Sequence, residues 1–211
     1  AMLSPVYIFL FICMALTAIT EFGPNQWVSI ILSSSGAEPM IILALTSGLM
    51  AVGRFFAGPV VGTLGQTGVL VISAILATIG IYMFSTVTGP MAYVAAVIFA
   101  LGICYFWPVM IGSVAQRVPR SSALGMSIVG GVGMFSTSIF QPIIGSWIDN
   151  SRAANTARGL TGNALELATG QSALLKMLTF PAILVVLFII FFVWQKNSKT
   201  VTESEMTMAV H

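Results

Sequence analysis

Residues 21–27 read EFGPNQW, and this polar string stands inside an otherwise apolar stretch of the chain. It combines a carboxylate, two side-chain amides, a glycine, a proline and an indole. The flanking segments 1–20 and 28–37 contain no Asp, Glu, Lys or Arg. A charged side chain at the centre of a bilayer costs about 3 kcal/mol on insertion scales, so a carboxylate retained there suggests a function.

The composition indicates a protein whose surface faces lipid rather than water. Hydrophobic residues make up 57% of the chain and charged residues only 7%, against about 25% charged residues in an ordinary soluble domain. The long segments 55–116, 121–148 and 177–195 contain no charged side chain. These apolar runs continue through the whole chain, which excludes a signal peptide as their explanation. No basic patch is present that would bind nucleic acid.

We predict an all-α membrane protein with six transmembrane helices in residues 1–195, because hydrocarbon requires each span to satisfy its own backbone hydrogen bonds. The spans cover about 5–33, 39–63, 68–87, 91–115, 122–148 and 173–195. Residues 149–172 are polar and are predicted to form an extracytoplasmic loop with a short surface helix at 163–168. Residues 196–211 are predicted to form a polar cytoplasmic tail.

Lysine and arginine positions predict the side of the membrane on which the termini lie. Six spans place both termini on one side, and cytoplasmic connections carry an excess of Lys and Arg. The side of the termini carries four basic residues, Arg117, Arg120, Lys196 and Lys199, and Arg54 lies near that face. The other side carries three, Arg152, Arg158 and Lys176. We therefore expect a multi-pass protein of the cell (inner) membrane with both termini cytoplasmic.

Two proline-containing patterns recur along the chain. The string YFWPVMI at 105–111 has an aromatic residue two places before a proline, as EFGPNQW has, and GPVVGTL at 58–64 is matched by QPIIGSW at 141–147. The spacing between the two patterns is also similar, because Pro24 and Pro59 are 35 residues apart and Pro108 and Pro142 are 34 residues apart. With three spans in each copy, the second copy enters the membrane from the opposite side. Such inverted-topology repeats are the architecture of many secondary transporters. The alternative is coincidence, because prolines are common in membrane helices.

Three stretches carry a resemblance to a known family. They are VGRFFAGPVVGTLGQTGVL at 52–70, LGICYFWPVMIGSVAQRVP at 101–119 and GMSIVGGVGMFSTSIFQPIIGSWID at 125–149. They resemble the second, fourth and fifth helices of the C-terminal six-helix half of a major facilitator superfamily transporter. That resemblance implies half of a twelve-helix fold, built as two inverted three-helix repeats.

The match to the family pattern is incomplete in the loop after the second span. Gly53-Arg54 and Gly58-Pro59 agree with the pattern. The usual acidic residue and basic cluster are replaced by Thr63, Gln66 and Thr67, which puts a charged gate at this loop in doubt. The glutamate, asparagine and tryptophan of the first span are similar to those of sugar or nucleoside proton symporters, including the fucose permease group.

The resemblance implies a secondary active transporter that moves a small polar solute, such as a sugar or a nucleoside, with protons and by alternating access. One six-helix bundle cannot form a two-sided gate alone. We therefore expect a missing N-terminal six-helix half, or a second copy of this chain, as its partner in the lipid bilayer. The alternative is a self-associating six-helix channel or scaffold without coupled transport.

The candidate site in the first span centres on Glu21. The carboxylate either binds solute hydroxyls or carries the transported proton; alternatively, it pairs with a neighbouring helix or reaches interfacial water. Pro24 removes a backbone donor, and Asn25, Gln26 and Trp27 follow it. An aromatic face with a few polar groups is typical of small-molecule sites. Trp27 has the alternative of an interfacial position.

Candidate residues of the other spans follow from the repeat. Tyr105, Phe106 and Trp107 are the counterparts around Pro108. One of these rings is expected to face the cavity; the alternative is that they pack against neighbouring helices. Gln141 needs a polar partner, which is either the solute or another helix.

Arg54 either extends to the lipid headgroups or forms an interhelical anchor or gate. Pro59 and Pro142 are the matched helix breaks of the second and fifth spans.

Enzymatic chemistry is not expected from this sequence. The single histidine is the last residue, His211, and the acidic residues are scattered among spans and loops. Cys13 and Cys104 both fall in apolar runs and are interpreted as small core residues rather than as a disulfide or metal site. We therefore expect no cofactor and no catalytic residue.

Overall fold

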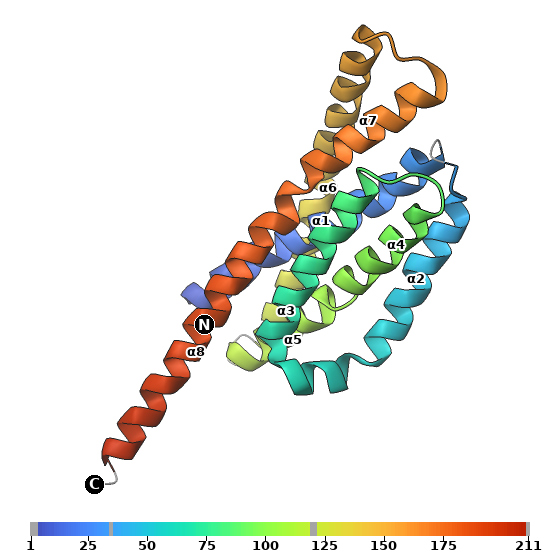
Figure 1. Cartoon of the computed structure of the whole chain (residues 1–211). Helices are drawn as coiled ribbons and strands as arrows, with labels where there is room; N and C mark the ends of the chain where they lie inside the picture. Colours follow the sequence, from blue (N-terminus) through green and yellow to red (C-terminus); the bar gives the residue numbers. More distant parts are fainter. Residues whose placement is uncertain (1–3, 34–35, 119–121, 210–211) are drawn as a thin grey trace.

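The computed structural model of the chain describes the backbone of residues 4–33, 36–118 and 122–209, and the side chains of these residues except 28–33, 122 and 198–209. Within these ranges the protein is all-α and contains no strand, which confirms the predicted fold class at this level (Figure 1). The helices are α1 (Pro5–Ser33), α2 (Pro39–Phe55), α3 (Ala57–Phe84), α4 (Met91–Ile103), α5 (Phe106–Arg117), α6 (Ser122–Ala157), α7 (Gly162–Met177) and α8 (Thr179–Ala209).

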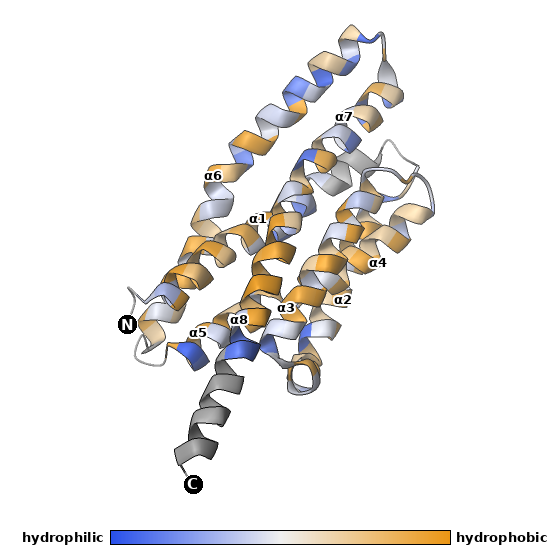
Figure 2. Ribbon diagram, turned by 60° about the vertical axis from the view of Figure 1, so that its left-hand side comes forward, coloured by the Kyte–Doolittle hydropathy of each residue, from blue (hydrophilic) through white to orange (hydrophobic). Residues whose placement is uncertain are grey.

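Several helical stretches are long and apolar enough to cross a membrane. Within the described residues they are Pro5–Trp27, Ala57–Phe84, Met91–Arg117, Ala123–Ala157 and Gly162–Asn197, and α2 is a shorter apolar helix. Large apolar side chains are also exposed on the outside of the bundle, for example Ile79 on α3 and Ile190 on α8. In Figure 2 much of the helical ribbon has the colour of hydrophobic residues. Such a surface is stable in lipid and not in water, so these features indicate a multi-pass membrane protein.

Two predicted spans are broken rather than continuous. The span predicted at 39–63 stops at Phe55, and α3 starts at Ala57 and bends again at Gly65, whose φ is 70°. The span predicted at 91–115 divides into α4 and α5 at Cys104. Prolines explain one break directly, because Pro108 has no N–H for the carbonyl of Cys104 four residues earlier.

Pro24 and Pro142, which are predicted as helix breaks or gate positions, do not interrupt their helices. Both lie inside continuous helices, α1 and α6. Pro24 is buried in the bundle, and its neighbour Gly23 faces Ile144 of α6 closely. Neighbouring helices can hold a helix straight where a proline removes one backbone hydrogen bond.

The predicted extracytoplasmic loop at 149–172 is largely helical. α6 continues to Ala157 and α7 begins at Gly162, so the turn between them is short. Gly159 (φ 82°) and Gly162 (φ 58°) provide the left-handed backbone of this turn. Alanine, leucine and glutamate in the segment favour helix, and this preference outweighs its polarity. The backbone of α8 likewise continues as a helix through the predicted tail to Ala209.

Several basic residues lie in polar contacts towards the two ends of the bundle. Arg117 and Gln195, which precedes Lys196, are in hydrogen-bond contact at one end. Arg152 bonds to Glu166 and Lys176 bonds to Ser151, and both contacts join α6 to α7. The hairpin of these two helices projects at the other end of the bundle (Figure 2). Arg120 lies outside the described residues, and so does the side chain of Lys199. Which end is cytoplasmic stays a prediction.

Small residues allow the closest helix packing, which joins α3 to α4. A Cβ atom at Gly80 would lie 2.6 Å from the Cα of Phe99, and one at Gly102 would collide with the backbone of Ala77. Without a hydrophobic driving force between helices in lipid, such close backbone approach is a main source of association. α1 packs on α6, α2 packs on α4, and α8 covers α3.

We expect Gly102→Val to destabilise the bundle, because the new side chain has no space against Ala77. Overpacking of this kind costs about 1–3 kcal/mol, and it would be measured as a lower midpoint of thermal unfolding in detergent. Gly131→Val is the matched control, since a Cβ there meets no described atom within 4 Å. Equal melting of the two variants would show that α3 and α4 do not pack as described.

Candidate functional site

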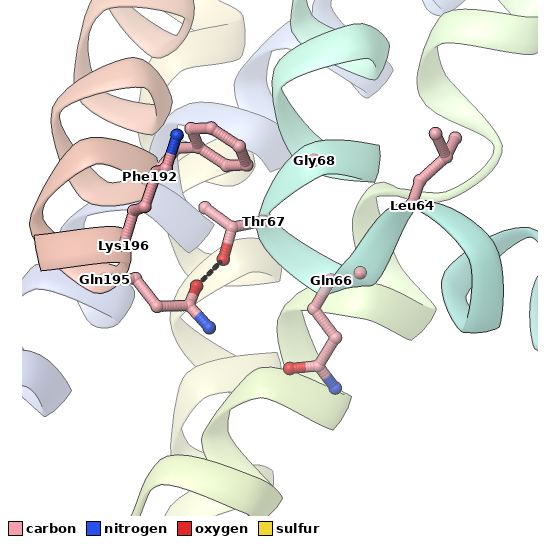
Figure 3. Close-up of a pocket in the computed structure, with 8 residues that line it drawn as sticks. Leu64, Gln66, Thr67, Gly68, Phe192, Gln195 and Lys196 are labelled. Atoms are coloured by element: carbon pink, nitrogen blue, oxygen red, sulfur yellow. Dashed lines mark hydrogen bonds between the residues drawn. The ribbon is translucent and has the colours of Figure 1, made fainter. Parts of the chain in front are cut away.

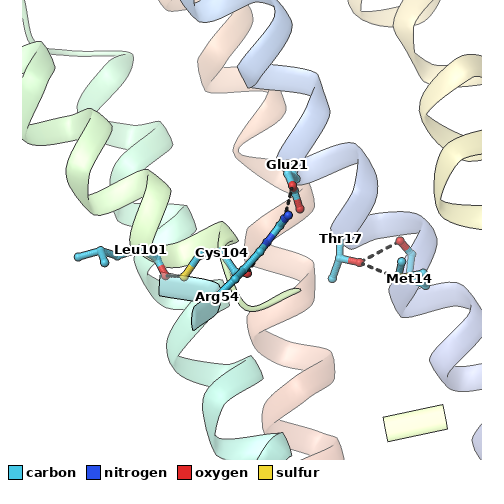
Figure 4. Close-up of polar contacts among 6 residues, drawn as sticks. All are labelled: Met14, Thr17, Glu21, Arg54, Leu101 and Cys104. Carbon is cyan, nitrogen blue, oxygen red and sulfur yellow. Dashed lines mark hydrogen bonds and ion pairs between the residues drawn. The ribbon is translucent and has the colours of Figure 1, made fainter. Parts of the chain in front are cut away.

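The first predicted site residue, Glu21, forms an ion pair with Arg54. Nη2 of Arg54 on α2 lies 3.3 Å from Oε1 of Glu21 on α1 (Figure 4). The Glu21 side chain is 2% exposed, whereas that of Arg54 is 42% exposed. The pair therefore joins a buried carboxylate to a guanidinium that stands at an open face of the bundle.

The break between α4 and α5 gives Arg54 its second partner. Pro108 leaves the carbonyl of Cys104 without its helical donor, and Nε of Arg54 donates to this oxygen at 3.2 Å. Gly53 permits the approach, because a Cβ atom there would lie 3.0 Å from Sγ of Cys104. Of the two interpretations of Arg54, the geometry therefore favours the interhelical anchor over extension to the headgroups.

Two polar atoms beside this pair have no hydrogen-bond partner among the described residues. They are Oε2 of Glu21 and Nε1 of Trp107, and both are buried. The Trp107 indole approaches the Glu21 carboxylate, and its ring packs edge-on to Phe22 with centroids 6.0 Å apart. Buried polar groups are nearly always satisfied in native proteins, so this acceptor and donor either interact with each other or share a water or a polar ligand.

A second contact brings together two more of the predicted residues. Nε1 of Trp27 on α1 donates to Oε1 of Gln141 on α6 at 3.0 Å. The Gln141 amide nitrogen donates to the carbonyl oxygen of Phe22 at 3.4 Å. Gln141 therefore makes the helix contact that was one of its two expected roles, and it holds α6 against α1 next to Glu21.

The remaining predicted residues are not gathered at one point. Asn25 is half-buried and Gln26 is exposed, and neither makes a side-chain hydrogen bond within the described residues. Tyr105 lies at the α4–α5 break with its hydroxyl close to Gly53. Pro108 lines a shallow pocket of about 220 Å³ together with residues of α3. Pro59 and Pro142 are exposed on their helices.

Sequence reasoning missed the backbone oxygen of Cys104 as a site group. The signal was present, because a proline four residues downstream always leaves a carbonyl without its helical N–H. It also treated Arg117 only as a marker of sidedness, although Arg117 donates hydrogen bonds to Thr67 and Gln195. The latter contact joins residues 78 positions apart, which no local pattern could reveal.

No protein-family model, curated protein or solved structure matches the chain. The chemistry of the site must therefore be argued from its own geometry. That geometry is a buried carboxylate paired with a half-exposed guanidinium, beside an unsatisfied indole N–H.

We expect Arg54→Gln to lower stability by about 2 kcal/mol, because it leaves the Glu21 carboxylate buried without a counter-charge. Removing one partner of a fully buried pair costs about 3–5 kcal/mol, and the partial exposure of Arg54 reduces this value. The free energy of unfolding in detergent would be compared with that of the double variant Glu21→Gln, Arg54→Gln.

The double variant should be more stable than Arg54→Gln alone, since it contains no unpaired charge. Arg152→Gln is the control, because its pair with Glu166 is exposed and should contribute less than about 1 kcal/mol. If Glu21→Gln and Arg54→Gln, each measured alone, have effects that add up to that of the double variant, the ion pair would be contradicted.

Proposed function

We propose that the chain is a six-helix half of a secondary active transporter of the major facilitator type, moving a small polar solute such as a sugar or a nucleoside together with protons. The observation that carries this proposal is the buried Glu21, which is paired with Arg54 through one oxygen and unsatisfied at the other. Ionisable residues inside membrane spans are costly and usually belong to solute or proton pathways.

The groups around Glu21 suit a ligand rich in hydroxyls. A sugar hydroxyl can donate to Oε2 of Glu21 and accept from Nε1 of Trp107, the two atoms without partners. The aromatic face of Trp107 can stack against an apolar ring face, and Arg54 can donate from the open side of the bundle. A few polar groups set among aromatic side chains is the usual composition of a small-molecule site.

The same ion pair offers a means of proton coupling. A proton on Glu21 would cancel its charge and remove its attraction for Arg54. Arg54 would then keep its bond to the Cys104 carbonyl on the α4–α5 side while its contact with α1 weakened. Solute binding and protonation would thus act on one contact between α1 and α2.

The helix contacts support an inverted repeat without being identical in the two copies. In the proposed repeat the first span (α1) corresponds to the fourth (α4 and α5), and the second (α2) corresponds to the fifth (α6). The contact of α1 with α6 should therefore have a counterpart between α4 and α2, and both contacts are extensive. The copies differ in detail, because the chain breaks at Cys104 in the fourth span but continues through Pro24 in the first.

The flanks of the bundle offer surfaces for a second six-helix bundle. α2 and α6 lie at opposite sides in Figure 2, and each exposes large apolar side chains. They are Met40, Ile41, Leu43, Val52 and Phe55 on α2, and Leu124, Met134, Phe135, Ile139 and Ile143 on α6. An N-terminal six-helix half or a second copy of this chain would cover them, and alternating access would be the rocking of the two bundles about Glu21.

The alternative is a channel or scaffold without coupled transport. It is favoured by the contact of Trp27 with Gln141, which uses two candidate site residues purely to join α1 to α6. In that case the Glu21–Arg54 pair would also be an assembly contact.

Uptake into proteoliposomes tests the proposal. Radiolabelled sugars and nucleosides would be offered to vesicles containing this chain with its partner bundle, with and without a pH gradient. Glu21→Gln should reduce gradient-driven accumulation at least about tenfold, because it removes the group that exchanges the proton. Glu166→Gln, in the exposed pair of the α6–α7 hairpin, should accumulate solute normally. Normal accumulation by Glu21→Gln would exclude its coupling role, and conductance without accumulation would favour the channel.

Cysteine labelling tests the proposed orientation in the inner membrane. Cys13 and Cys104 are buried, so they should react slowly with a maleimide. A cysteine introduced at either polar end should therefore account for most of the label. A membrane-impermeant maleimide should label Arg158→Cys from outside and leave Lys196→Cys unlabelled until the membrane is permeabilised. The reverse pattern would place the termini outside.

A further inference from the structure

A separate pocket lies between α8 and the bend of α3, and it contains none of the residues around Glu21. Its volume is about 230 Å³. It is lined by Leu64, Gly65, Gln66, Thr67, Gly68, Phe192, Gln195 and Lys196 (Figure 3). The pocket exists because Gly65 takes a φ of 70°, which turns the first part of α3 away from the rest of the helix.

A cation without a carboxylate partner stands behind this pocket. Nη2 of Arg117 donates to Oγ1 of Thr67 at 3.1 Å and to Oε1 of Gln195 at 2.8 Å. Its guanidinium also lies 4.6 Å from the centroid of the Phe191 ring. Within the described residues these partners are all neutral, so none of them neutralises the positive charge of Arg117.

The contacts of Arg117 fix the polarity of the pocket wall. A guanidinium can only donate hydrogen bonds, so the oxygen of Gln195 must face Arg117 and Thr67. The amide N–H groups of Gln195 are then left for the pocket. The oxygen of Gln66 accepts from Ser113 at 3.2 Å, which leaves a second amide nitrogen as a donor.

Further positive potential comes from the surroundings of the pocket. Lys196 forms part of its wall. The helical segment after Gly65 starts at the pocket, and the N-terminal end of a helix carries a partial positive charge. The pocket thus combines N–H donors with the charges of Arg117 and Lys196.

We infer that this pocket binds a phosphate group, carried by an anionic lipid headgroup or present as free phosphate. The donors and the charges match the oxygens and negative charge of phosphate. The apolar side chains of Leu64 and Phe192 line the same pocket and are 49% and 44% exposed, so they would lie beside the acyl chains of a lipid. Basic pockets between membrane helices commonly hold anionic headgroups.

Gln195→Glu is the most informative variant. The new carboxylate still accepts from Arg117 and Thr67, so the helix contact is kept, but it replaces the amide donors by negative charge. Lys196→Gln removes one charge from the wall. Arg158→Gln is the matched control, because it removes one charge from the hairpin at the other end of the bundle.

Native mass spectrometry of the purified chain, titrated with phosphatidylglycerol or phosphatidylcholine, measures binding directly. The wild type should prefer phosphatidylglycerol. Gln195→Glu and Lys196→Gln should each weaken its binding about tenfold or more, as expected for hydrogen bonds to a charged group, while Arg158→Gln should bind normally. If Gln195→Glu does not fold, the affinity of Lys196→Gln for phosphatidylglycerol decides the test.

Competition with inorganic phosphate identifies the source of the ligand. Displacement of phosphatidylglycerol would show that a phosphate group alone suffices, and failure to displace it would show that the lipid is required; both results agree with a phosphate site. Equal binding of the two lipids by the wild type would overturn the inference. Unchanged binding by the folded variants, or an equal loss in Arg158→Gln, would also overturn it.

Discussion

The guanidinium of Arg54 links the helices around the candidate site. It pairs with Glu21 on α1 and donates to the carbonyl oxygen of Cys104 at the α4–α5 break. In the hydrocarbon environment a buried carboxylate needs a counter-charge, and the carbonyl left without its helical N–H by Pro108 needs a hydrogen-bond donor. One side chain satisfies both needs, and in doing so it fixes α2 between α1 and the break.

The rest of the bundle is arranged so that this link can form. Gly53 removes the side chain that would separate α2 from Cys104. On the other side of α1, Gln141 bonds to Trp27 and to the Phe22 carbonyl, and so places α6 beside Glu21. The site therefore depends on contacts between helices distant in sequence, and a change in any of them would alter the surroundings of the carboxylate.

Composition was sufficient to predict the helical class and the apolar spans, because lipid leaves the backbone few alternatives. The course of individual helices was harder to predict. Pro24 and Pro108 occupy matching places in the sequence, yet only the fourth span breaks, since neighbouring helices decide whether a missing hydrogen bond bends a helix. The polarity of segment 149–172 predicts a loop with a short helix at 163–168, whereas helices α6 and α7 extend through most of it and form a hairpin.

The sequence indicates which residues are candidates for the site, but not which of them contact one another. Glu21 and Arg54 stand out in the sequence as charges within apolar spans, but their pairing depends on how α2 packs, which no local sequence pattern indicates. Solid-state NMR in lipid bilayers can measure the dipolar coupling between the Glu21 carboxylate carbon and the Arg54 guanidinium nitrogens. We predict a strong coupling, as expected for Nη2 and Oε1 atoms 3.3 Å apart. A coupling that places the two groups more than about 6 Å apart, beyond the range of a direct charge pair, would contradict the account.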